Sequence, residues 1–209
     1  MRPAARYGVY LVTDQGLCLG RELLEVICAA VAGGAGVVQL REKNLSTRAF
    51  VALAVAVKER LAPLCVPLLI NDRLDVALAA DADGVHVGQD DMPAGLARQL
   101  LGPDKLLGLS VHTPEEALTA EDADVDYLGV GPIFATKTKP DAKAPIGLAG
   151  LARIRAATGR PLVGIGGIGP ENAAGVIRAG AAGVAVVSAI CSAASPRDAA
   201  AALARALAR

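Results

Sequence analysis

The stretch PLLINDRLDVALAADADGVHVGQDD, residues 67–91, decides the fold. It contains two short, mostly apolar runs, 67–70 and 84–87, and a polar turn follows each of them. A helix-like segment lies between the runs, so they are expected to be parallel strands joined by a helix. Parallel neighbours lie roughly 4.8 Å apart and end at the same edge of a sheet. Asp72 and Asp91 follow these two strand ends, so we expect their carboxylates to lie near each other.

The same strand–turn–helix unit recurs about eight times along the 209 residues. Most of the predicted strands are continuous apolar runs, which is typical of strands covered on both faces in a parallel sheet. The predicted strands are 7–13, 37–40, 67–70, 84–87, 106–109, 127–130, 162–165 and 183–187. The predicted helices are 21–32, 46–61, 74–80, 93–101, one opened by Pro114, 148–157, one opened by Pro170, and 196–208.

Eight such units predict a compact (β/α)8 barrel, a TIM barrel of the α/β class, with residues 1–209 in a single domain. An open, doubly wound sheet is the alternative, because βα repeats can form either architecture. In both folds the chemistry belongs at the carboxyl ends of the strands.

Composition excludes several classes of protein. The 21 basic and 21 acidic side chains cancel, and aromatic residues make up only 2%, which argues against a nucleic-acid partner. The first apolar run, 9–12, is too short for a signal peptide, and no run is long enough to span a bilayer. The four cysteines are scattered, which favours buried free thiols over disulfides. We therefore expect a cytoplasmic protein with no membrane partner.

A basic strand end follows the second predicted strand, at Gln39-Leu40-Arg41-Glu42-Lys43. Alternation along an extended chain places Gln39, Arg41 and Lys43 on one side. Two cations and an amide at a barrel mouth suit a phosphate-bearing substrate. The alternative is a solvated strand end with a loose ion pair through Glu42, and spacing alone favours neither interpretation.

Carboxylates follow the third and fourth predicted strands, where Asn71 precedes Asp72 and Asp90 precedes Asp91. Magnesium prefers one or two carboxylates together with phosphate oxygens and water. Helix capping is the alternative role for both aspartates. Capping explains one aspartate more easily than two neighbouring acidic strand ends with Asn71, so the pattern favours a magnesium site.

Polar residues also follow the fifth and sixth strands. Ser110 is placed to donate to a phosphate or a leaving group, and no nucleophile-elbow motif supports a hydrolytic triad. His112 is either an acid or base or, as the pattern favours, a histidine bonded within its turn, and His86 is expected in the core. The loop 132–145 is long enough to be a lid, and its hydroxyls and ammoniums suit oxyanions; an exposed basic loop is the alternative. These side chains are Thr136, Lys137, Thr138 and Lys139.

The glycine-rich segment 164–169 formally matches G-x-G-x-x-G. It lies in the seventh unit rather than the first, and no acidic residue follows near the next strand end, so a dinucleotide site is not expected. Gly166 and Gly167 instead let a small phosphate approach backbone N–H groups, and Val187 and Ser188 after strand eight complete the cup. Tight turns alone are the alternative.

Taken together, these motifs resemble the thiamine phosphate synthase family. They occur in that family's order over residues 7 to about 190, and one departure is Ala135, where the family often has proline. The segments that carry the resemblance are 39–43, 71–72, 88–91, 108–113, 131–134, 136–139 and 164–168.

The resemblance implies two small phosphorylated substrates, a hydroxymethylpyrimidine diphosphate and a methylthiazole with a phosphoethyl arm. The products are thiamine phosphate and pyrophosphate, formed by a dissociative substitution with no enzyme nucleophile. Asp72 and Asp91 are implied magnesium (Mg2+) ligands. Arg41, Lys43, Ser110 and Lys139 are implied catalytic groups. The implied substrate-binding residues are Gln39, Leu40, Arg41, Glu42, Lys43, Asn71, Ser110, Thr136, Lys137, Thr138, Lys139, Gly166, Gly167, Val187 and Ser188.

Two other functions fit parts of the pattern. A thiazole tautomerase on the same barrel would use His112 as a proton shuttle and would need no metal pair. A phosphate-ligand sensor would keep the glycine cup, but it has no use for two aspartates near a basic strand end. The sequence leaves open whether the chain forms a homo-oligomer.

Overall fold

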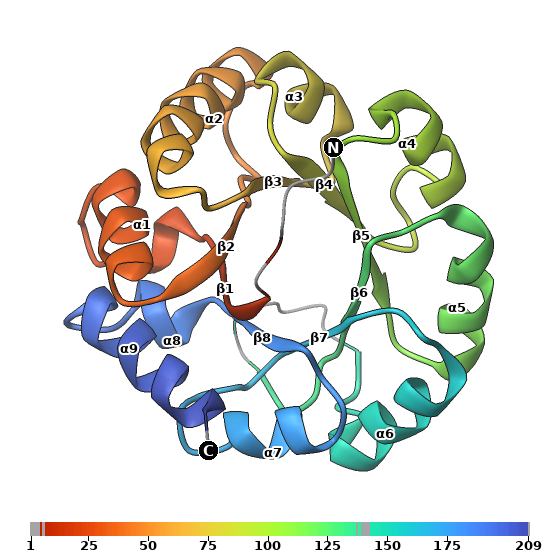
Figure 1. The fold of residues 1–209 in the computed structure, drawn as a ribbon. Helices are drawn as coiled ribbons and strands as arrows, with labels where there is room; N and C mark the ends of the chain where they lie inside the picture. Colours follow the sequence, from red (N-terminus) through yellow and green to blue (C-terminus); the bar gives the residue numbers. More distant parts are fainter. Residues whose placement is uncertain (1–4, 6, 137, 139–142, 209) are drawn as a thin grey trace.

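In a computed structural model the chain forms a closed barrel of eight parallel strands in sequence order (Figure 1). The structure describes residues 5, 7–136, 138 and 143–208. Strand β1 pairs with both β2 and β8, so the sheet closes on itself. The predicted TIM barrel is therefore confirmed, and the open sheet is wrong. The strands are β1 Gly8–Val12, β2 Ala35–Leu40, β3 Leu68–Asn71, β4 Gly84–Val87, β5 Leu106–Val111, β6 Tyr127–Val130, β7 Leu162–Ile165 and β8 Gly183–Val186.

Helices surround the barrel (Figure 1). The α-helices are α1 Leu23–Ala32, α2 Thr47–Leu61, α3 Leu74–Ala79, α4 Ala94–Leu101, α5 Pro114–Thr119, α6 Gly147–Ala157, α7 Ala173–Arg178, α8 Ser188–Cys191 and α9 Pro196–Leu207. The described residues also form three short 3-10 helices, η1 Gln15–Leu17, η2 Ala62–Leu64 and η3 Ala120–Ala123.

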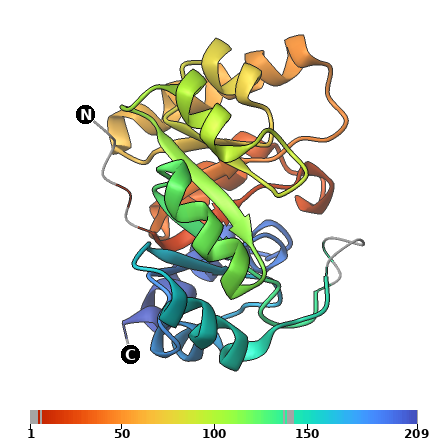
Figure 2. The ribbon, with the colours of Figure 1, turned by 90° about the vertical axis from the view of Figure 1, so that its right-hand side faces the viewer.

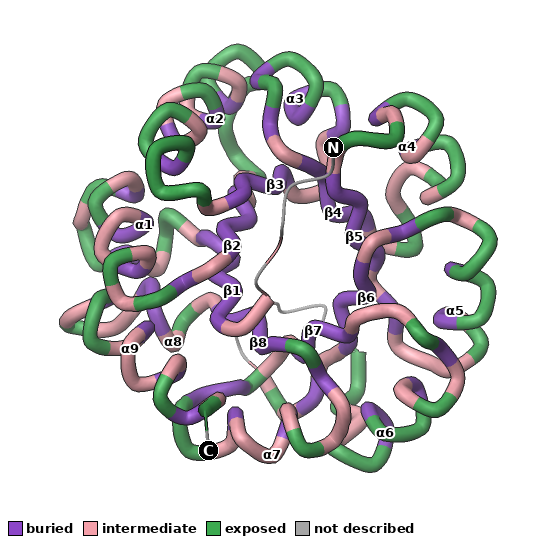
Figure 3. Tube along the Cα trace, in the orientation of Figure 1, coloured by how far each residue is buried: buried purple, intermediate pink, exposed green. Residues whose placement is uncertain are grey.

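Both faces of the strands are buried, as the apolar runs predict (Figure 3). The larger core lies between strands and helices, and a smaller one fills the barrel interior. Alternation decides which residue enters which core. On β6, Tyr127 points into the barrel and Leu128 faces the helices. In the side view of Figure 2 the light-green strand arrow points to the right, so the carboxyl ends of the parallel strands lie at that end.

Local capping explains several helix starts. Ser46 caps α2 by accepting from the Ala49 N–H at 3.3 Å, and Pro114 opens α5 behind Thr113, as predicted. The helix start at Pro170 is wrong, because α7 begins only at Ala173. The Asn172 side chain accepts from Gly169 N and donates to Gly167 O, both at 3.0 Å, and this holds the segment in a turn.

Other bounds also differ from the sequence expectation; for example, β2 begins at Ala35 and α1 at Leu23. Strand β5 continues to Val111, so Ser110 lies within the strand, and the short helix α8 was not predicted. All four cysteines are free, as expected, but Cys65 is exposed and Cys28 only partly buried. Among the described residues, no helix has the length and apolar character needed to cross a membrane.

Candidate active site

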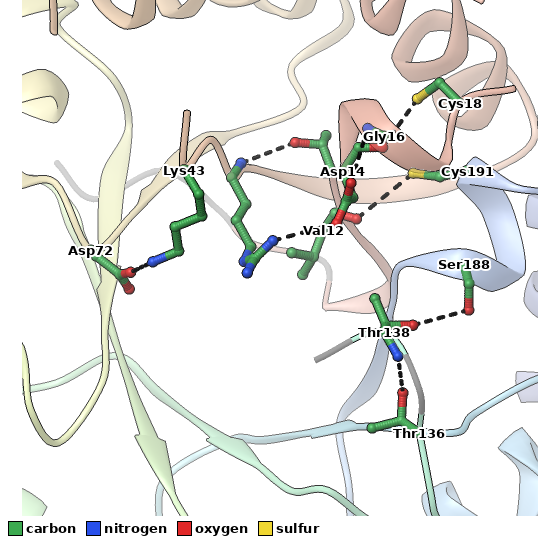
Figure 4. Close-up of polar contacts among 12 residues, drawn as sticks. Val12, Asp14, Gly16, Cys18, Lys43, Asp72, Thr136, Thr138, Ser188 and Cys191 are labelled. Carbon is green, nitrogen blue, oxygen red and sulfur yellow. Dashed lines mark hydrogen bonds and ion pairs between the residues drawn. The ribbon is translucent and has the colours of Figure 1, made fainter. Parts of the chain in front are cut away.

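The basic end of β2 and the polar end of β3 meet at the barrel mouth. Lys43 Nζ donates to Asp72 Oδ2 at 2.5 Å (Figure 4). Asn71 Nδ2 donates to Asp72 Oδ1 at 2.8 Å. Arg41 pairs with Asp14, with 3.5 Å between Nη1 and Oδ2. Among the residues that the structure describes, no ion pair through Glu42 forms at this strand end. The carboxylates at Asp14 and Asp72 hold both cations at the mouth.

Asp91 lies beside Asp72. The Gly88 N–H donates to Asp91 Oδ2 at 2.7 Å and orients the carboxylate. Burial raises the pKa of the Asp91 carboxyl, and the nearby Asp72 carboxylate raises this pKa further. Strand pairing explains the proximity, because Asn71 on β3 is in register with His86 on β4. The structure therefore brings the two aspartates together, as expected from their strand ends.

Neither aspartate caps a helix. The N-cap of α3 is Arg73 and that of α4 is Pro93, and neither cap residue makes a side-chain capping bond. Asp72 has a left-handed backbone with φ of 60°. The capping interpretation of Asp72 and Asp91 is therefore wrong, and the two carboxyl groups lie close to each other instead.

The donor set at Asp72 and Asp91 fits magnesium. Among the described residues, no group of three or more acidic, histidine or cysteine side chains could hold a metal ion. Magnesium does not need such a cage, since it takes one or two carboxylates and completes its shell with phosphate oxygens and water. Two adjacent carboxylates at a mouth that also carries Arg41 and Lys43 suit a magnesium ion that arrives with a phosphorylated substrate.

Ser110 and His112, both named from the sequence, lie at the end of β5, and each makes hydrogen bonds there. Ser110 Oγ is 2.9 Å from His86 Nε2, and the Ser110 carbonyl accepts from Gln89 Nε2 at 2.7 Å. His112 Nδ1 is 3.0 Å from the Gly131 carbonyl oxygen, and its backbone N–H donates to Glu116 at 2.5 Å. His112 therefore bonds both within its own turn and across to the end of β6.

Gln39 and Leu40 face opposite sides of β2. Gln39 is only 5% exposed, and its Nε2 donates to the Tyr10 hydroxyl at 2.8 Å inside the barrel. Leu40 is fully buried in the core between strands and helices, so only its backbone can contact a substrate. Tyr10 and Asp14 are contacts that the sequence analysis missed. Their position on β1 and just after it is the signal that could have found them.

The glycine-rich end of β7 lies under the segment that follows β6. Gly166 and Gly167 have φ of 96° and 63°, in the left-handed region. A Cβ added at Gly166 would lie 2.6 Å from Pro132 Cβ, and one at Gly167 would lie 2.5 Å from the Ala135 carbonyl oxygen. Both glycines are thus required by backbone shape and by close approach, so the turn interpretation holds without excluding a phosphate.

Hydroxyl groups gather beside these glycines. Thr138 Oγ1 donates to Ser188 Oγ at 3.4 Å, and the Thr138 N–H donates to Thr136 Oγ1 at 3.2 Å (Figure 4). Ser188 is the first residue of α8, and Val187 packs at the edge of the barrel-interior core. The predicted lysines of this loop, Lys137 and Lys139, lie outside the described residues.

Comparison with known proteins gives a consistent result. A family model described as thiamine monophosphate synthase matches residues 9–190. The thiamine-phosphate synthase of Chloroflexus aurantiacus is 60% identical over 182 residues, covering 87% of this chain and 84% of that protein. The thiamine-phosphate synthase of Moorella thermoacetica is 54% identical and covers 90% of each chain. A solved structure of thiamine phosphate pyrophosphorylase from Pyrococcus furiosus superposes with a TM-score of 0.89 at 37% identity, covering 97% of this chain and 96% of that one.

Proposed function

Because this chain belongs to the thiamine monophosphate synthase family, we propose a role for each polar group at its barrel mouth in making thiamine phosphate. The chain is a transferase that couples a pyrimidine diphosphate with a thiazole phosphate and releases pyrophosphate. Neither the tautomerase nor the sensor alternative is retained, because relatives that are 54–60% identical to this chain are named thiamine-phosphate synthases.

The pyrimidine diphosphate lies against the ends of β2, β3 and β5 in this proposal. Arg41 and Lys43 neutralise the negative charge that develops as pyrophosphate departs. The observation that supports this role is that both cations reach the same mouth as Asp72 and already bind carboxylates there. Gln39, Asn71 and Ser110 add neutral hydrogen-bonding groups, and Leu40 and Glu42 contribute backbone.

Asp72 and Asp91 hold magnesium in this proposal. When bound, the ion supplies Lewis-acid stabilisation of the departing diphosphate. The protein's part is to keep both carboxylates aligned. Asn71 and Lys43 donate to Asp72, and the Gly88 N–H donates to Asp91, so hydrogen bonds orient both carboxylates.

The thiazole phosphate lies against Gly166, Gly167, Thr136, Thr138 and Ser188, beside Val187, in this proposal. Hydroxyl and backbone N–H donors suit a phosphate. The roles of Lys137 and Lys139, as a loop contact and as a cation on the diphosphate, rest on the family resemblance. Alignment of the two substrates in one barrel mouth lets the thiazole nitrogen attack the pyrimidine methylene carbon along a dissociative path.

We also propose that residues 1–209 form one domain, since one closed barrel contains every strand of the described chain. A cytoplasmic location is the corresponding proposal, supported by free thiols at Cys18, Cys28, Cys65 and Cys191, which suit a reducing compartment.

The magnesium assignment is tested by Asp91→Asn and Asp72→Asn, with Asp75→Asn as the matched control. The Asp75 side chain is 58% exposed at the start of α3, and it pairs with Arg73 rather than with Arg41 or Lys43. Coupled turnover is measured across a magnesium titration. Loss of one carboxylate ligand is expected to reduce kcat/KM by about 100-fold or more, since the metal supplies several kcal/mol of charge stabilisation. Wild-type turnover by Asp91→Asn at the same magnesium concentrations would show that this carboxylate does not hold the ion.

A further inference from the structure

A chain of hydrogen bonds crosses the barrel interior beneath the mouth. The hydroxyls of Tyr10 on β1 and Tyr127 on β6 are 2.7 Å apart, although 117 residues separate them in sequence. Tyr127 Oη is 2.8 Å from His86 Nδ1 on β4. Tyr10 and Tyr127 are 1% exposed and His86 is 8% exposed. Buried polar groups of this kind are costly unless all of them are paired, so the pairing itself is informative.

The two ends of the chain are substrate-binding residues. Gln39 Nε2 donates to Tyr10 Oη at 2.8 Å at one end, and His86 Nε2 lies 2.9 Å from Ser110 Oγ at the other. Both Gln39 and Ser110 are assigned above to the pyrimidine diphosphate. The chain therefore joins two side chains of one substrate site, on β2 and β5, through residues that reach no substrate themselves.

The barrel is shaped around the middle of this chain. A Cβ added at Gly108 would lie 2.3 Å from Tyr127 Cζ and 2.4 Å from His86 Nδ1. A Cβ added at Gly129 would lie 2.8 Å from His86 Cε1. These two strand glycines make room for the Tyr127 and His86 rings, where any larger residue would displace them.

The donor and the acceptor of each hydrogen bond can be assigned in turn, and they run in one direction along the hydrogen-bond chain. Gln39 donates its amide N–H to Tyr10, so the Tyr10 hydroxyl proton goes to Tyr127, and the Tyr127 proton goes to His86 Nδ1. A ring nitrogen that accepts a hydrogen bond carries no proton, so the His86 ring is neutral and has one proton. That proton is then on Nε2 and is donated to Ser110 Oγ.

Reversing the hydrogen bond between Tyr10 and Tyr127 would leave a buried hydroxyl proton without an acceptor. If Tyr127 donated to Tyr10, the Tyr10 hydroxyl would accept two hydrogen bonds. Its own proton would then have no acceptor among the described residues, where Tyr10 Oη contacts only Gln39 and Tyr127. An unsatisfied buried donor costs about 1–3 kcal/mol, and this disfavours the reverse arrangement.

We propose that Tyr10, Tyr127 and His86 are positioning residues whose one-directional hydrogen-bond chain presents the Gln39 amide oxygen as an acceptor and the Ser110 hydroxyl as a donor. The inference rests on the proposed function for its ligand. An aminopyrimidine offers N–H donors to the Gln39 oxygen, and a diphosphate offers acceptor oxygens to the Ser110 proton. The donor and acceptor are set before substrate arrives, which lowers the cost of organising the site.

The direction is tested by the tautomer of His86 in protein labelled with 15N at histidine. The polypeptide has only two histidines, His86 and His112, so two sets of ring 15N signals are expected. The set that disappears in His112→Gln belongs to His112. His86 is expected as the Nε2–H tautomer. His112 is expected to carry its proton on Nδ1, because that atom faces the Gly131 carbonyl, which can only accept. An Nδ1–H tautomer for His86 would overturn the proposed direction, whatever reaction the chain catalyses.

The positioning role is tested by Tyr127→Phe, with Tyr7→Phe as its matched control. Tyr7 stacks on Tyr127 with 4.9 Å between ring centroids, but its hydroxyl is outside the chain. Tyr127→Phe removes two hydrogen bonds and is expected to raise the KM for the pyrimidine diphosphate about tenfold. The KM for the thiazole phosphate is expected to stay unchanged, and both constants are expected to stay unchanged in Tyr7→Phe.

Two outcomes of the kinetic test contradict the role. A lower free energy of unfolding with both KM values unchanged in Tyr127→Phe would mean that the hydrogen-bond chain is only structural. A rise in both KM values together would mean that the barrel has distorted. If Tyr127→Phe does not fold, Tyr10→Phe cuts the chain one step nearer Gln39 and carries the same expectations. Absence of turnover by the wild-type chain would contradict the proposed function and leave the tautomer result standing.

Discussion

Arg98 binds four partners at the end of the barrel opposite the mouth, and replacing it separates stability from chemistry. Its Nη2 donates to Asp126 Oδ2 at 2.7 Å, and its Nη1 donates to the carbonyls of Gly102 and Lys105, both at 2.8 Å. Its Nε donates to the Asp124 carbonyl at 3.1 Å. The side chains of Arg98 and Asp126 are only 11% and 10% exposed. Arg98→Met removes the charge and these bonds but keeps an apolar stem.

The expected loss follows from this burial. Breaking a buried ion pair by removing one partner costs about 3–5 kcal/mol. Asp126 keeps its bond from the Leu107 N–H at 2.7 Å, so we expect the lower limit of that range. A loss of about 3 kcal/mol corresponds to a fall in Tm of about 6–12 °C for a chain of this length.

The control is Arg73→Met. Arg73 and Asp75 are even closer, at 2.5 Å, but their side chains are 40% and 58% exposed. An exposed pair is worth about 1 kcal/mol at most. Judged by distance alone, the Arg73 ion pair would stabilise the fold more than the Arg98 pair. Judged by burial, the Arg98 pair stabilises it more.

The assay is urea unfolding at 25 °C, together with turnover at the same temperature without urea. Arg98→Met is expected to lose unfolding free energy and keep its kcat, because in this fold the mouth carries the chemistry and the opposite end carries stability. Equal losses of unfolding free energy in the two arginine variants would refute the reasoning from burial. A large fall in kcat with unchanged stability would refute the separation of the two ends.

Three other changes have expected outcomes. Ser46→Ala removes the cap of α2 and should lower the unfolding free energy by about 1 kcal/mol in urea unfolding, with turnover unchanged. Gly108→Ala crowds Tyr127 and His86. It should lower the unfolding free energy, measured in urea, by about 1–3 kcal/mol and raise the KM for the pyrimidine diphosphate. The folded-state pKa of His86, about 4, lies below its unfolded value of about 6.5, so only the unfolded chain takes up this proton between those pH values. Wild-type stability should therefore fall as the pH drops from about 6.5 to 4, by up to about 1.4 kcal/mol per pH unit, and His86→Gln should lack that component of the fall.

Part of the candidate site was predictable because its information is local. Asp72 and Asp91 each follow an apolar run, and the rule that parallel strands end at one edge places them together before any coordinates are known. The bounds of β4, β6 and β7 were predicted without error, since each run is bounded by polar, proline or glycine residues. The start of α7 was wrong because the Asn172 side chain, rather than Pro170, decides where that helix begins.

The sequence by itself indicated eight repeating strand–helix units, the strand ends that carry chemistry, and the proximity of the acidic ends of the third and fourth strands. Those features depend on hydrophobic runs and on the residues directly after them. Only the tertiary structure decided that Tyr10, Tyr127 and His86 meet, and that Arg41 takes Asp14 as its partner. The physical reason is closure of the sheet: it brings inward-pointing side chains from distant strands into contact, and their separations along the chain follow no periodic pattern.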